Sequence, residues 1–282
     1  MSSRVLESAL RILAGLAIAY AVLAILAWRY QEKLAFPGQR VRLLDPAAVG
    51  IPDGQRVTLT ASDGVRLHGW YLPPAPRPTT GRAPALLWFY GNMETISGLG
   101  SIIRDLRPPG TVVLILDYRG YGESEGTPTE AGLYRDADAA WEFLSAHADV
   151  DSARIAVYGR SLGAAVALHL ADTRPVRALV LESPFSSAAE MAREHYRLLP
   201  SFIIRLSLDN VARASRLRVP LLVLHGTEDR IAPLRMGRAV AEAGRARELV
   251  LIEGAGHNDT YDMGGARYRE KLHEYLRSTL LP

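Results

Sequence analysis

Residues 155–170 read IAVYGRSLGAAVALHL, and this stretch decides the fold. The apolar run at 155–158 predicts a buried strand, and the alanine- and leucine-rich run from residue 162 onward predicts a helix. Between them lies a Gly-x-Ser-x-Gly motif with Ser161 at its centre. Such a turn presents the serine oxygen at the strand end, and its two glycines leave room for close backbone approach. Alone, the motif could be a tight turn capped by serine. Between a strand and a helix, it makes Ser161 a candidate nucleophile.

Two later loops supply the groups that a serine nucleophile needs. The sequence HGTEDRIAP at 225–233 follows a predicted strand and places Asp229 in the loop after it. The sequence EGAGHND at 253–259 follows the last predicted strand and places His257 in a glycine-rich loop. A histidine can take the serine proton, and a carboxylate can hold the histidine in the required tautomer. The order Ser161, Asp229, His257, with separations of 68 and 28 residues, therefore predicts a catalytic triad.

Neighbouring residues compete for two of these roles. Glu228 adjoins Asp229, and Asp259 and Asp262 lie near the histidine in sequence, so Asp229 is selected by its position after a strand. Only His257 lies in the loop that follows the last predicted strand, which selects it as the base. The other histidines that could compete for this role are His68, His147, His169, His195, His225 and His273.

Outward from the motif, short apolar runs alternate with helical patterns, which is typical of a mostly parallel sheet with helices on both faces. The first two strands flank Ser62-Asp63-Gly64 and predict an antiparallel hairpin at the sheet edge. We therefore expect one α/β domain over residues 55–282. The eight predicted strands are 56–60, 65–72, 85–90, 112–117, 155–158, 178–181, 221–225 and 248–252, and the predicted helices are 94–106, 130–147, 162–172, 234–243 and 266–279.

The segment 184–219 is too long for a simple crossover and predicts a small helical insertion over the strand ends. Its apolar run at 198–204 reads LLPSFII, which is more apolar surface than a solvated loop should expose. Two interpretations are open. These side chains either cover Ser161 and line a pocket for an acyl group, or pack on the sheet as ordinary core. We expect the first.

The N-terminus carries a separate apolar segment. Residues 12–28 contain no charge, and the 20 residues from Ala9 to Trp28 would reach about 30 Å as a helix, enough to cross a bilayer core. We expect residues 1–36 to form a single-pass membrane anchor and juxtamembrane segment, with Trp28 at the interface. A cleaved signal peptide and a buried helix of a soluble protein are the alternatives.

Basic residues flank this apolar segment on both sides, so the side of the membrane that the body occupies stays open. Arg4 and Arg11 precede the segment, while Arg29 and Lys33 follow it. Residues 37–54 contain three prolines and three glycines with little periodicity, and they predict a linker that leads into the body.

Beyond the triad order, several segments resemble those of one protein family. The chain resembles an α/β-hydrolase of the Bem46 and ABHD13/ABHD17-like group over roughly residues 30–280. The resemblance implies a serine hydrolase with Ser161 as nucleophile, His257 as general base and then acid, and Asp229 as the residue that holds the imidazole. The segments that carry it are QEKLAFP at 31–37, DYRGYGES at 117–124, ESPF at 182–185 and GAGHN at 254–258.

An oxyanion hole requires main-chain N–H donors aimed at the developing charge. Leu162, directly after the nucleophile, is the first candidate. The second is expected in the loop after the strand at 85–90, where we assign it to Asn92 with Met93 as the alternative. The family usually has His-Gly-Asn-Ala at this point, so Tyr90 and Met93 depart from its pattern. We expect Tyr90 to keep a hydrogen bond that supports the loop.

Composition narrows the class of function. A chain without cysteine has no disulfide, no thiolate zinc site and no cysteine nucleophile. The balance of 33 Lys and Arg against 30 Asp and Glu is too even for a nucleic-acid binder that relies on charge. No histidine cluster has metal-ligand spacing, so neither metal nor cofactor is expected.

These observations predict an enzyme that hydrolyses carboxylic esters or thioesters through an acyl-enzyme. The expected substrates are small molecules or lipids with an ester group, including acylated ones. A peptidase of the same fold and a non-catalytic binding protein remain the alternatives. Chain length of the acyl group, the leaving group and the oligomeric state stay open.

Overall fold

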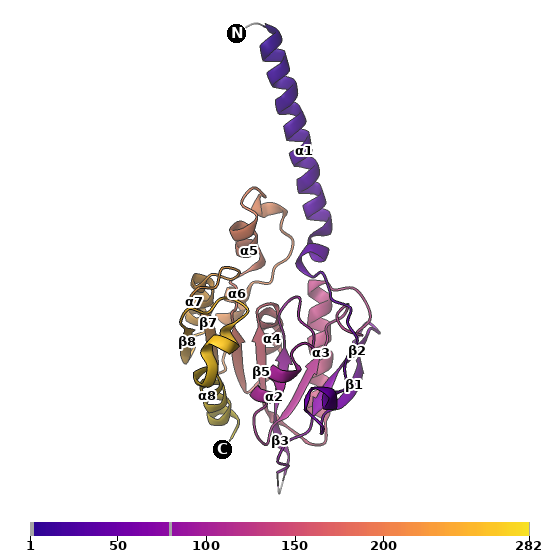
Figure 1. The fold of residues 1–282 in the computed structure, drawn as a ribbon, viewed down its shortest axis with the longest axis vertical. Helices are drawn as coiled ribbons and strands as arrows, with labels where there is room; N and C mark the ends of the chain where they lie inside the picture. Colours follow the sequence, from indigo (N-terminus) through magenta and orange to yellow (C-terminus); the bar gives the residue numbers. More distant parts are fainter. Residues whose placement is uncertain (1–2, 79–80, 282) are drawn as a thin grey trace.

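The computed structural model describes residues 3–78 and 81–281, and within these ranges eight strands form one sheet (Figure 1). The strand order is β1-β2-β4-β3-β5-β6-β7-β8. β1 pairs with β2, and β2 with β4, in antiparallel register, whereas the other neighbouring pairs are parallel. This confirms the predicted sheet and its hairpin edge. The strands span Gln55–Thr60 (β1), Arg66–Leu72 (β2), Ala83–Phe89 (β3), Val112–Leu116 (β4), Val150–Arg160 (β5), Ala178–Glu182 (β6), Leu221–Gly226 (β7) and Glu248–Ile252 (β8).

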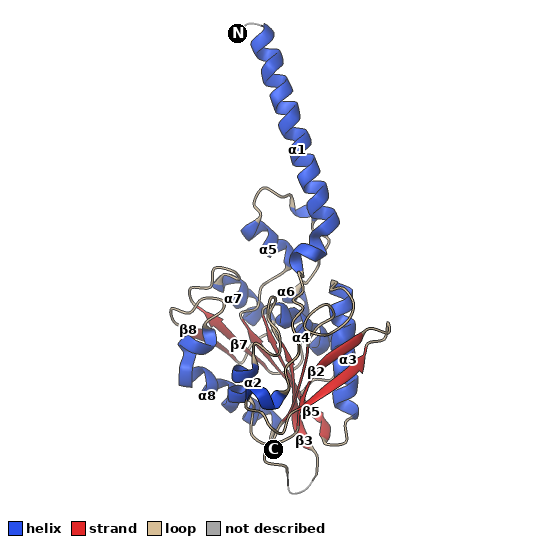
Figure 2. Ribbon diagram, turned by 45° about the vertical axis from the view of Figure 1, so that its right-hand side comes forward, coloured by secondary structure: helices blue, strands red, loops and turns tan. Residues whose placement is uncertain are grey.

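Helices cover both faces of this sheet, which explains why the central strands are apolar without alternation. Every residue of β3, β4, β6 and β7 is buried. Two pairs of helices pack together on opposite faces, α3 with α4 and α2 with α8 (Figures 1 and 2). The helices of the body are Gly100–Leu106 (α2), Glu130–Ala146 (α3), Leu162–Thr173 (α4), Ala188–His195 (α5), Asn210–Ala214 (α6), Leu234–Ala243 (α7) and Thr260–Leu280 (α8).

Two helices begin away from their predicted first residue. α2 begins at Gly100 because the residues before it form turns, in which the Glu94 carboxylate accepts the N–H of Gly91 at 2.6 Å. α8 begins earlier than predicted, at Thr260, and has a break at Gly265, where φ is 50°. Both irregular segments lie next to strand ends, where the candidate site residues are found.

The segment 37–54 is more firmly packed than the predicted linker. It contains a short 3-10 helix, η1 (Pro46–Val49), and its side chains of Leu43 and Ile51 are only 1% and 2% exposed. Isolated apolar residues at irregular spacing produce no periodic signal, so the sequence pattern did not reveal this packing. The segment therefore belongs to the body, although it has little regular structure.

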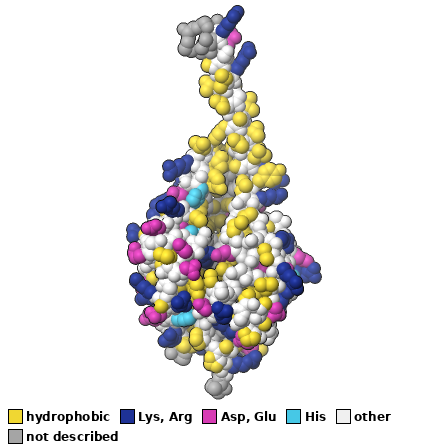
Figure 3. Space-filling view, viewed as in Figure 1, with side chains coloured by type: hydrophobic (Ala, Val, Ile, Leu, Met, Phe, Trp, Pro, Cys, Tyr) yellow, Lys and Arg dark blue, Asp and Glu magenta, His cyan; other side chains and the backbone are white. Residues whose placement is uncertain are grey.

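A single long helix, α1 (Ser3–Ala35), extends away from the body (Figures 1 and 2). Between Glu7 and Ala35, its most apolar 18-residue stretch has a mean hydropathy of 2.3, and none of that stretch is buried. Hydrophobic side chains cover its surface in Figure 3. The helix is long and apolar enough to cross a membrane, and its exposure argues against the interpretation as a core helix.

The insertion at 184–219 is helical, as predicted, and consists of α5, a 3-10 helix η2 (Ser201–Ile203) and α6. The interpretation of its apolar run as core is wrong for Leu198 and Phe202, whose side chains are 84% and 86% exposed. The expected role in an acyl pocket stays a prediction. The run lies beside α1, where the Tyr20 hydroxyl donates to the Leu198 carbonyl at 2.6 Å.

Candidate active site

Ser161 lies on a strained turn between the end of β5 and the first residue of α4. Its backbone has φ 51° and ψ −112°, a conformation that residues other than glycine rarely adopt. The turn is fixed in part by the Ser161 N–H, which donates to the Glu182 carbonyl at 2.9 Å. The serine oxygen is thereby held at the carboxyl end of the sheet, where ligands enter open α/β folds.

The two glycines of the motif are required by close packing. A Cβ atom on Gly159 would lie 2.3 Å from the carbonyl oxygen of Gly163. A Cβ atom on Gly163 would lie 2.2 Å from the carbonyl oxygen of Phe89, at the end of β3. Any side chain at either position would force the helix away from the sheet, so the glycines set the position of Ser161.

The structure brings the three predicted triad residues together. The Nε2 atom of His257 is 2.8 Å from the Oγ atom of Ser161, and its Nδ1 atom is 2.7 Å from an Oδ atom of Asp229. His257 and Asp229 are 8% and 5% exposed, so the line of hydrogen bonds is largely shielded from water. A shielded arrangement of this kind can move the serine proton to the imidazole.

Asp229 is held as a carboxylate. Its second oxygen accepts the N–H groups of Ile231 and Ala232, at 2.9 and 2.8 Å. Burial raises the pKa of Asp229, but the hydrogen bond and charge of His257 and the N–H of Ala232 outweigh burial and hold that pKa below its usual value. The carboxylate can therefore fix the imidazole tautomer across the neutral pH range.

A second histidine, His225, lies close to the same carboxylate. Its Nε2 atom is 3.4 Å from Asp229, but it is also 2.8 Å from the carbonyl oxygen of Ala232. The side chain is fully buried, and this burial lowers the pKa of His225. A neutral His225 therefore donates a hydrogen bond within the turn after β7, and of these two histidines only His257 contacts the Ser161 side chain.

The two candidate oxyanion donors lie at the ends of β5 and β3. Leu162 is the first residue of α4, at the positive end of the helix dipole. Asn92 is fixed by its side chain, which donates to the Ala35 carbonyl at 2.7 Å and accepts from the Tyr121 hydroxyl at 2.5 Å. The N–H of Met93 donates to the Asn92 side chain at 3.2 Å. This hydrogen bond engages the main-chain N–H of Met93, and the assignment of the second oxyanion donor to Asn92 stays a prediction.

Tyr90 supports the same loop from within the core. Its hydroxyl donates to Asp117 at 2.9 Å, and its carbonyl accepts from the Tyr118 hydroxyl at 2.8 Å. Asp117 also accepts the N–H of Ile96 at 3.1 Å, and burial raises the pKa of Asp117 to about 6. Tyr90 thus keeps the supporting hydrogen bond that was expected where the family has histidine.

Arg160 joins the loops that carry the site, a role that no sequence pattern indicated. Its guanidinium donates to the His257 carbonyl at 2.7 Å and to the Asn258 side chain at 3.1 Å. It also forms ion pairs with Glu94 and with the buried Glu182. Glu94 holds Gly91 in the loop of the oxyanion candidate, so Arg160 links that loop to the loop of the candidate base.

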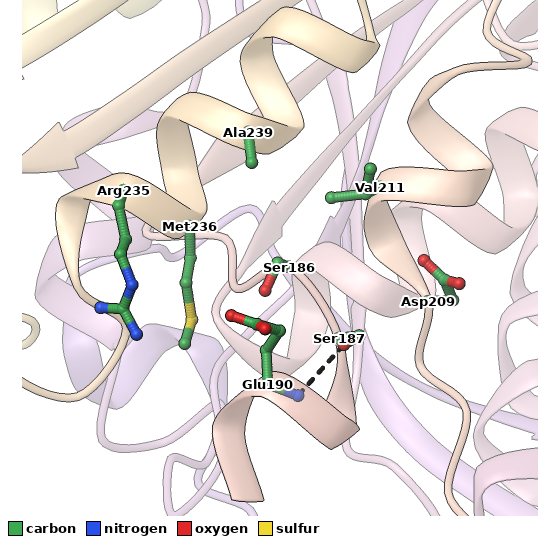
Figure 4. Close-up of a pocket in the computed structure, with 8 residues that line it drawn as sticks. All are labelled: Ser186, Ser187, Glu190, Asp209, Val211, Arg235, Met236 and Ala239. Carbon is green, nitrogen blue, oxygen red and sulfur yellow. Dashed lines mark hydrogen bonds between the residues drawn. The ribbon is translucent and has the colours of Figure 1, made fainter. Parts of the chain in front are cut away.

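The structure also contains a cavity of about 350 Å³ between α5, α6 and α7 (Figure 4). None of the triad residues lines it. The hydroxyl of Ser186 points toward Glu190 across this space, and among the described residues it has no hydrogen-bond partner. The cavity lies under the insertion and is lined by Ser186, Ser187, Glu190, Asp209, Val211, Arg235, Met236 and Ala239.

Comparison with known proteins identifies the family. Residues 82–208 match the family described as serine aminopeptidase, S33 (Hydrolase_4). The uncharacterized protein Rv2307c of Mycobacterium tuberculosis is 38% identical over 275 residues, which cover 96% of each chain. The α/β hydrolase domain-containing protein WAV2 of Arabidopsis thaliana is 32% identical over 88% of this chain and 87% of its own length. The chain is an α/β-hydrolase of the ABHD-like group.

Solved structures agree with this assignment at the level of the fold. The hydrolase superposes on the esterase Pf2001 of Pyrococcus furiosus with a TM-score of 0.66 and 20% sequence identity. The superposition covers 86% of the hydrolase and 98% of Pf2001. At this identity, the likeness concerns the α/β-hydrolase fold and carries no information about the substrate.

Proposed function

We propose that this hydrolase is a serine hydrolase that cleaves carboxylic ester or thioester bonds through an acyl-enzyme intermediate. The observation that carries the proposal is the continuous line of hydrogen bonds from Ser161 through His257 to Asp229. A serine in this position is activated by the adjacent base, while the carboxylate stabilises the imidazolium that forms. Lipidic or acylated molecules are the proposed substrates.

Each proposed role follows from the geometry. Ser161 Oγ attacks the carbonyl carbon as His257 Nε2 takes its proton, and the N–H groups of Leu162 and Asn92 bind the oxyanion. His257 then gives that proton to the departing alcohol or thiol, which leaves Ser161 acylated. Water attacks the acyl group in the second half, with His257 taking and returning a proton, and the carboxylic acid is released.

Two observations favour esters over the aminopeptidase activity in the family's description. An aminopeptidase needs a free carboxylate to bind the substrate ammonium group, and the acidic residues of α5 are engaged. Glu190 pairs with Arg193 at 2.6 Å, and Glu194 pairs with Arg235 at 2.6 Å. The cavity that Glu190 lines does not include the triad. A non-catalytic binding protein would not require the strained backbone of Ser161.

We further propose that α1 anchors the hydrolase in a membrane as a single span. Its length and hydropathy support this proposal, as do the aromatic residues Trp28 and Tyr30 near its body end. The base of the helix packs on the body, where Gln31 is 7% exposed and Phe36 is 2% exposed. Cleavage of a signal sequence is the alternative, and N-terminal sequencing of the membrane-bound protein distinguishes the two.

The first test changes the proposed nucleophile. Ser161→Ala should leave the thermal midpoint unchanged and lower the hydrolysis of nitrophenyl esters and fluorophosphonate labelling by at least about a thousand-fold. Ser183→Ala is the matched control, because Ser183 is buried at the same sheet edge and its hydroxyl has no partner among the described residues. Wild-type labelling of Ser161→Ala would remove the assignment.

Substrate class is tested with the same wild-type protein. A series of nitrophenyl esters of increasing acyl length, a thioester series and aminoacyl nitroanilides are compared by kcat/KM. Esters or thioesters should be preferred. Faster turnover of the nitroanilides would show a peptidase, in which case the triad would stand and the ester proposal would be wrong.

A further inference from the structure

The tip of the insertion, residues 196–204, lies against the exposed helix α1. The Leu198 carbonyl accepts from the Tyr20 hydroxyl at 2.6 Å. Just beyond the tip, the side-chain oxygen of Gln31 accepts the N–H groups of Arg205 and Leu206, at 2.7 and 3.1 Å. The tip is therefore fixed alongside the helix from its base to a point well inside the apolar span.

This contact places the tip at a defined level of the proposed membrane span. Tyr20 precedes Trp28 by eight residues, which corresponds to about 12 Å along the helix. If Trp28 lies at the interface, as aromatic residues prefer, the Leu198 carbonyl lies within the hydrocarbon region of the bilayer. At this depth, the exposed apolar side chains of the tip would contact acyl chains and not water.

The side chains of the tip match that environment. Leu198 and Phe202 are 84% and 86% exposed, and Tyr196 is 60% exposed. Figure 3 shows that hydrophobic side chains continue from α1 onto the adjoining part of the body. Exposed leucine and phenylalanine side chains are unfavourable in water, and burial among acyl chains removes this penalty.

One arginine, Arg197, lies within the tip, and another, Arg205, directly follows it. Arg197 and Arg205 are exposed, and the Arg205 guanidinium lies 4.8 Å from the Trp28 ring and donates to the Trp28 carbonyl at 3.1 Å. Both arginine side chains are long enough to extend toward phosphates. The nearby carboxylates of Glu190 and Glu194 are neutralised by arginines and do not oppose an anionic surface.

We propose that residues 196–204 insert into the lipid bilayer beside α1 as a second membrane contact, with Leu198 and Phe202 among the acyl chains. The inference rests on the proposed membrane anchoring of α1 and goes beyond it. The insertion follows the carboxyl end of β6, while Ser161 follows the carboxyl end of the adjacent β5. The second contact therefore turns the edge that carries Ser161 toward the bilayer, where an ester within a lipid is in reach.

The test uses the full-length chain, which contains no cysteine, so single cysteines can be introduced for labelling. Leu198→Cys and Phe202→Cys are labelled with an environment-sensitive fluorophore and reconstituted into phosphatidylcholine and phosphatidylglycerol vesicles. Leu16→Cys reports on α1 itself. Ser152→Cys is the control, because Ser152 is exposed at the amino end of β5, opposite to Ser161. Quenching by brominated acyl chains is compared with quenching by aqueous iodide.

Probes at 16, 198 and 202 should be quenched by the brominated lipids, with the probe at 152 quenched only by iodide. Quenching of 198 and 202 by iodide alone, while 16 responds to the lipids, would overturn the second contact and leave the anchor in place. Iodide quenching at all four positions would overturn both the anchor and the second contact. Fluorophosphonate labelling of the same vesicles reports separately on the proposed serine chemistry.

Discussion

Arg160 occupies one of the two variable positions in the Gly-x-Ser-x-Gly motif, yet it contacts more of the site than the glycines do. It touches the loop of His257 directly and the loop of Asn92 through Glu94. It also compensates the charge of Glu182, which is 2% exposed. We interpret it as a positioning residue, because it contacts no reacting atom and acts through the residues that do.

This role predicts different effects on activity and on stability. Arg160→Lys keeps a positive charge near Glu182 but lacks the planar fork that reaches the His257 carbonyl. We expect kcat to fall by about ten- to a hundred-fold while the thermal midpoint stays close to that of the wild type, since small displacements of catalytic groups are costly. Arg174→Lys, at a partly exposed pair with Asp138 on α3, is the control and should change neither quantity. A fall in kcat accompanied by a clear fall in the thermal midpoint would indicate that Arg160 is a purely structural residue.

Asp117 gives a pH-dependent prediction. Burial raises the pKa of Asp117 to about 6 from an ordinary value of 3.8. Between these pH values the folded protein holds a proton that the unfolded chain has released, so stability falls as the pH rises from about 4 to about 6. The difference corresponds to about 3 kcal/mol in the free energy of unfolding.

Asp117→Asn removes this titration because asparagine stays neutral. We expect the stability of the variant relative to the wild type to rise by about 3 kcal/mol between pH 4 and pH 7, whatever its constant offset. Denaturant unfolding of the detergent-solubilised protein at several pH values measures it. Two parallel pH curves would contradict the prediction.

At the scale of elements, the contact of α4 with the end of β3 depends on Gly163. Alanine there would bring its Cβ to 2.2 Å from the Phe89 carbonyl, a distance that no rotamer change can relieve. We expect Gly163→Ala to lower the free energy of unfolding by about 1–3 kcal/mol and to lower activity through displacement of Ser161. Gly98→Ala, where no atom lies nearer than 3.5 Å, is the control. Thermal unfolding and labelling rates measure both effects.

The bounds of some helices and strands were predicted from the sequence more accurately than those of others. β4, β6 and β7 were predicted to within one residue at each end, because continuous apolar runs between polar loops mark strands buried on both faces. The predicted start of α2 at residue 94 was wrong, because the residues before Gly100 form turns and the Glu94 carboxylate accepts the N–H of Gly91. The apolar residues Leu43 and Ile51 were assigned to a linker because their burial depends on tertiary packing alone.

In the candidate site, too, some residues were predictable from the sequence and others were not. Ser161, Asp229 and His257 were predicted together because the carboxyl ends of parallel strands meet at one edge of the sheet, so loop position decides proximity. Arg160 could not be paired from sequence. Its partners Glu94 and Glu182 lie 66 and 22 residues away, and many other carboxylates lie at comparable separations. The three-dimensional structure was needed to select among them.

At the scale of the whole molecule, the base of α1 belongs to the body. Gln31 binds the segment after the tip, and the Ala35 carbonyl accepts from the Asn92 side chain. A chain that begins at Trp28 should therefore be recovered without detergent and keep the thermal midpoint of the full-length protein. A chain that begins at Phe36 should also be soluble, but with a lower midpoint and lower activity.

Fractionation, thermal unfolding and ester hydrolysis of the two shortened chains and the full-length protein measure these effects. Full-length protein found in the soluble fraction without processing would contradict the anchor. Equal midpoints and activities for the chains that begin at Trp28 and at Phe36 would show that the contacts of Gln31 and Ala35 do not matter to the fold or to the site.

The hydrogen bond between Ala35 and Asn92 joins the last residue of α1 to the loop of a candidate oxyanion donor, with the buried Phe36 directly after it. No flexible segment separates the helix from the reaction centre. With α1 anchored as proposed, the helix would act as a rigid support that fixes the height of Ser161 relative to the membrane surface. The enzyme would then select substrates by where their scissile bond lies along the membrane normal, as well as by what surrounds that bond.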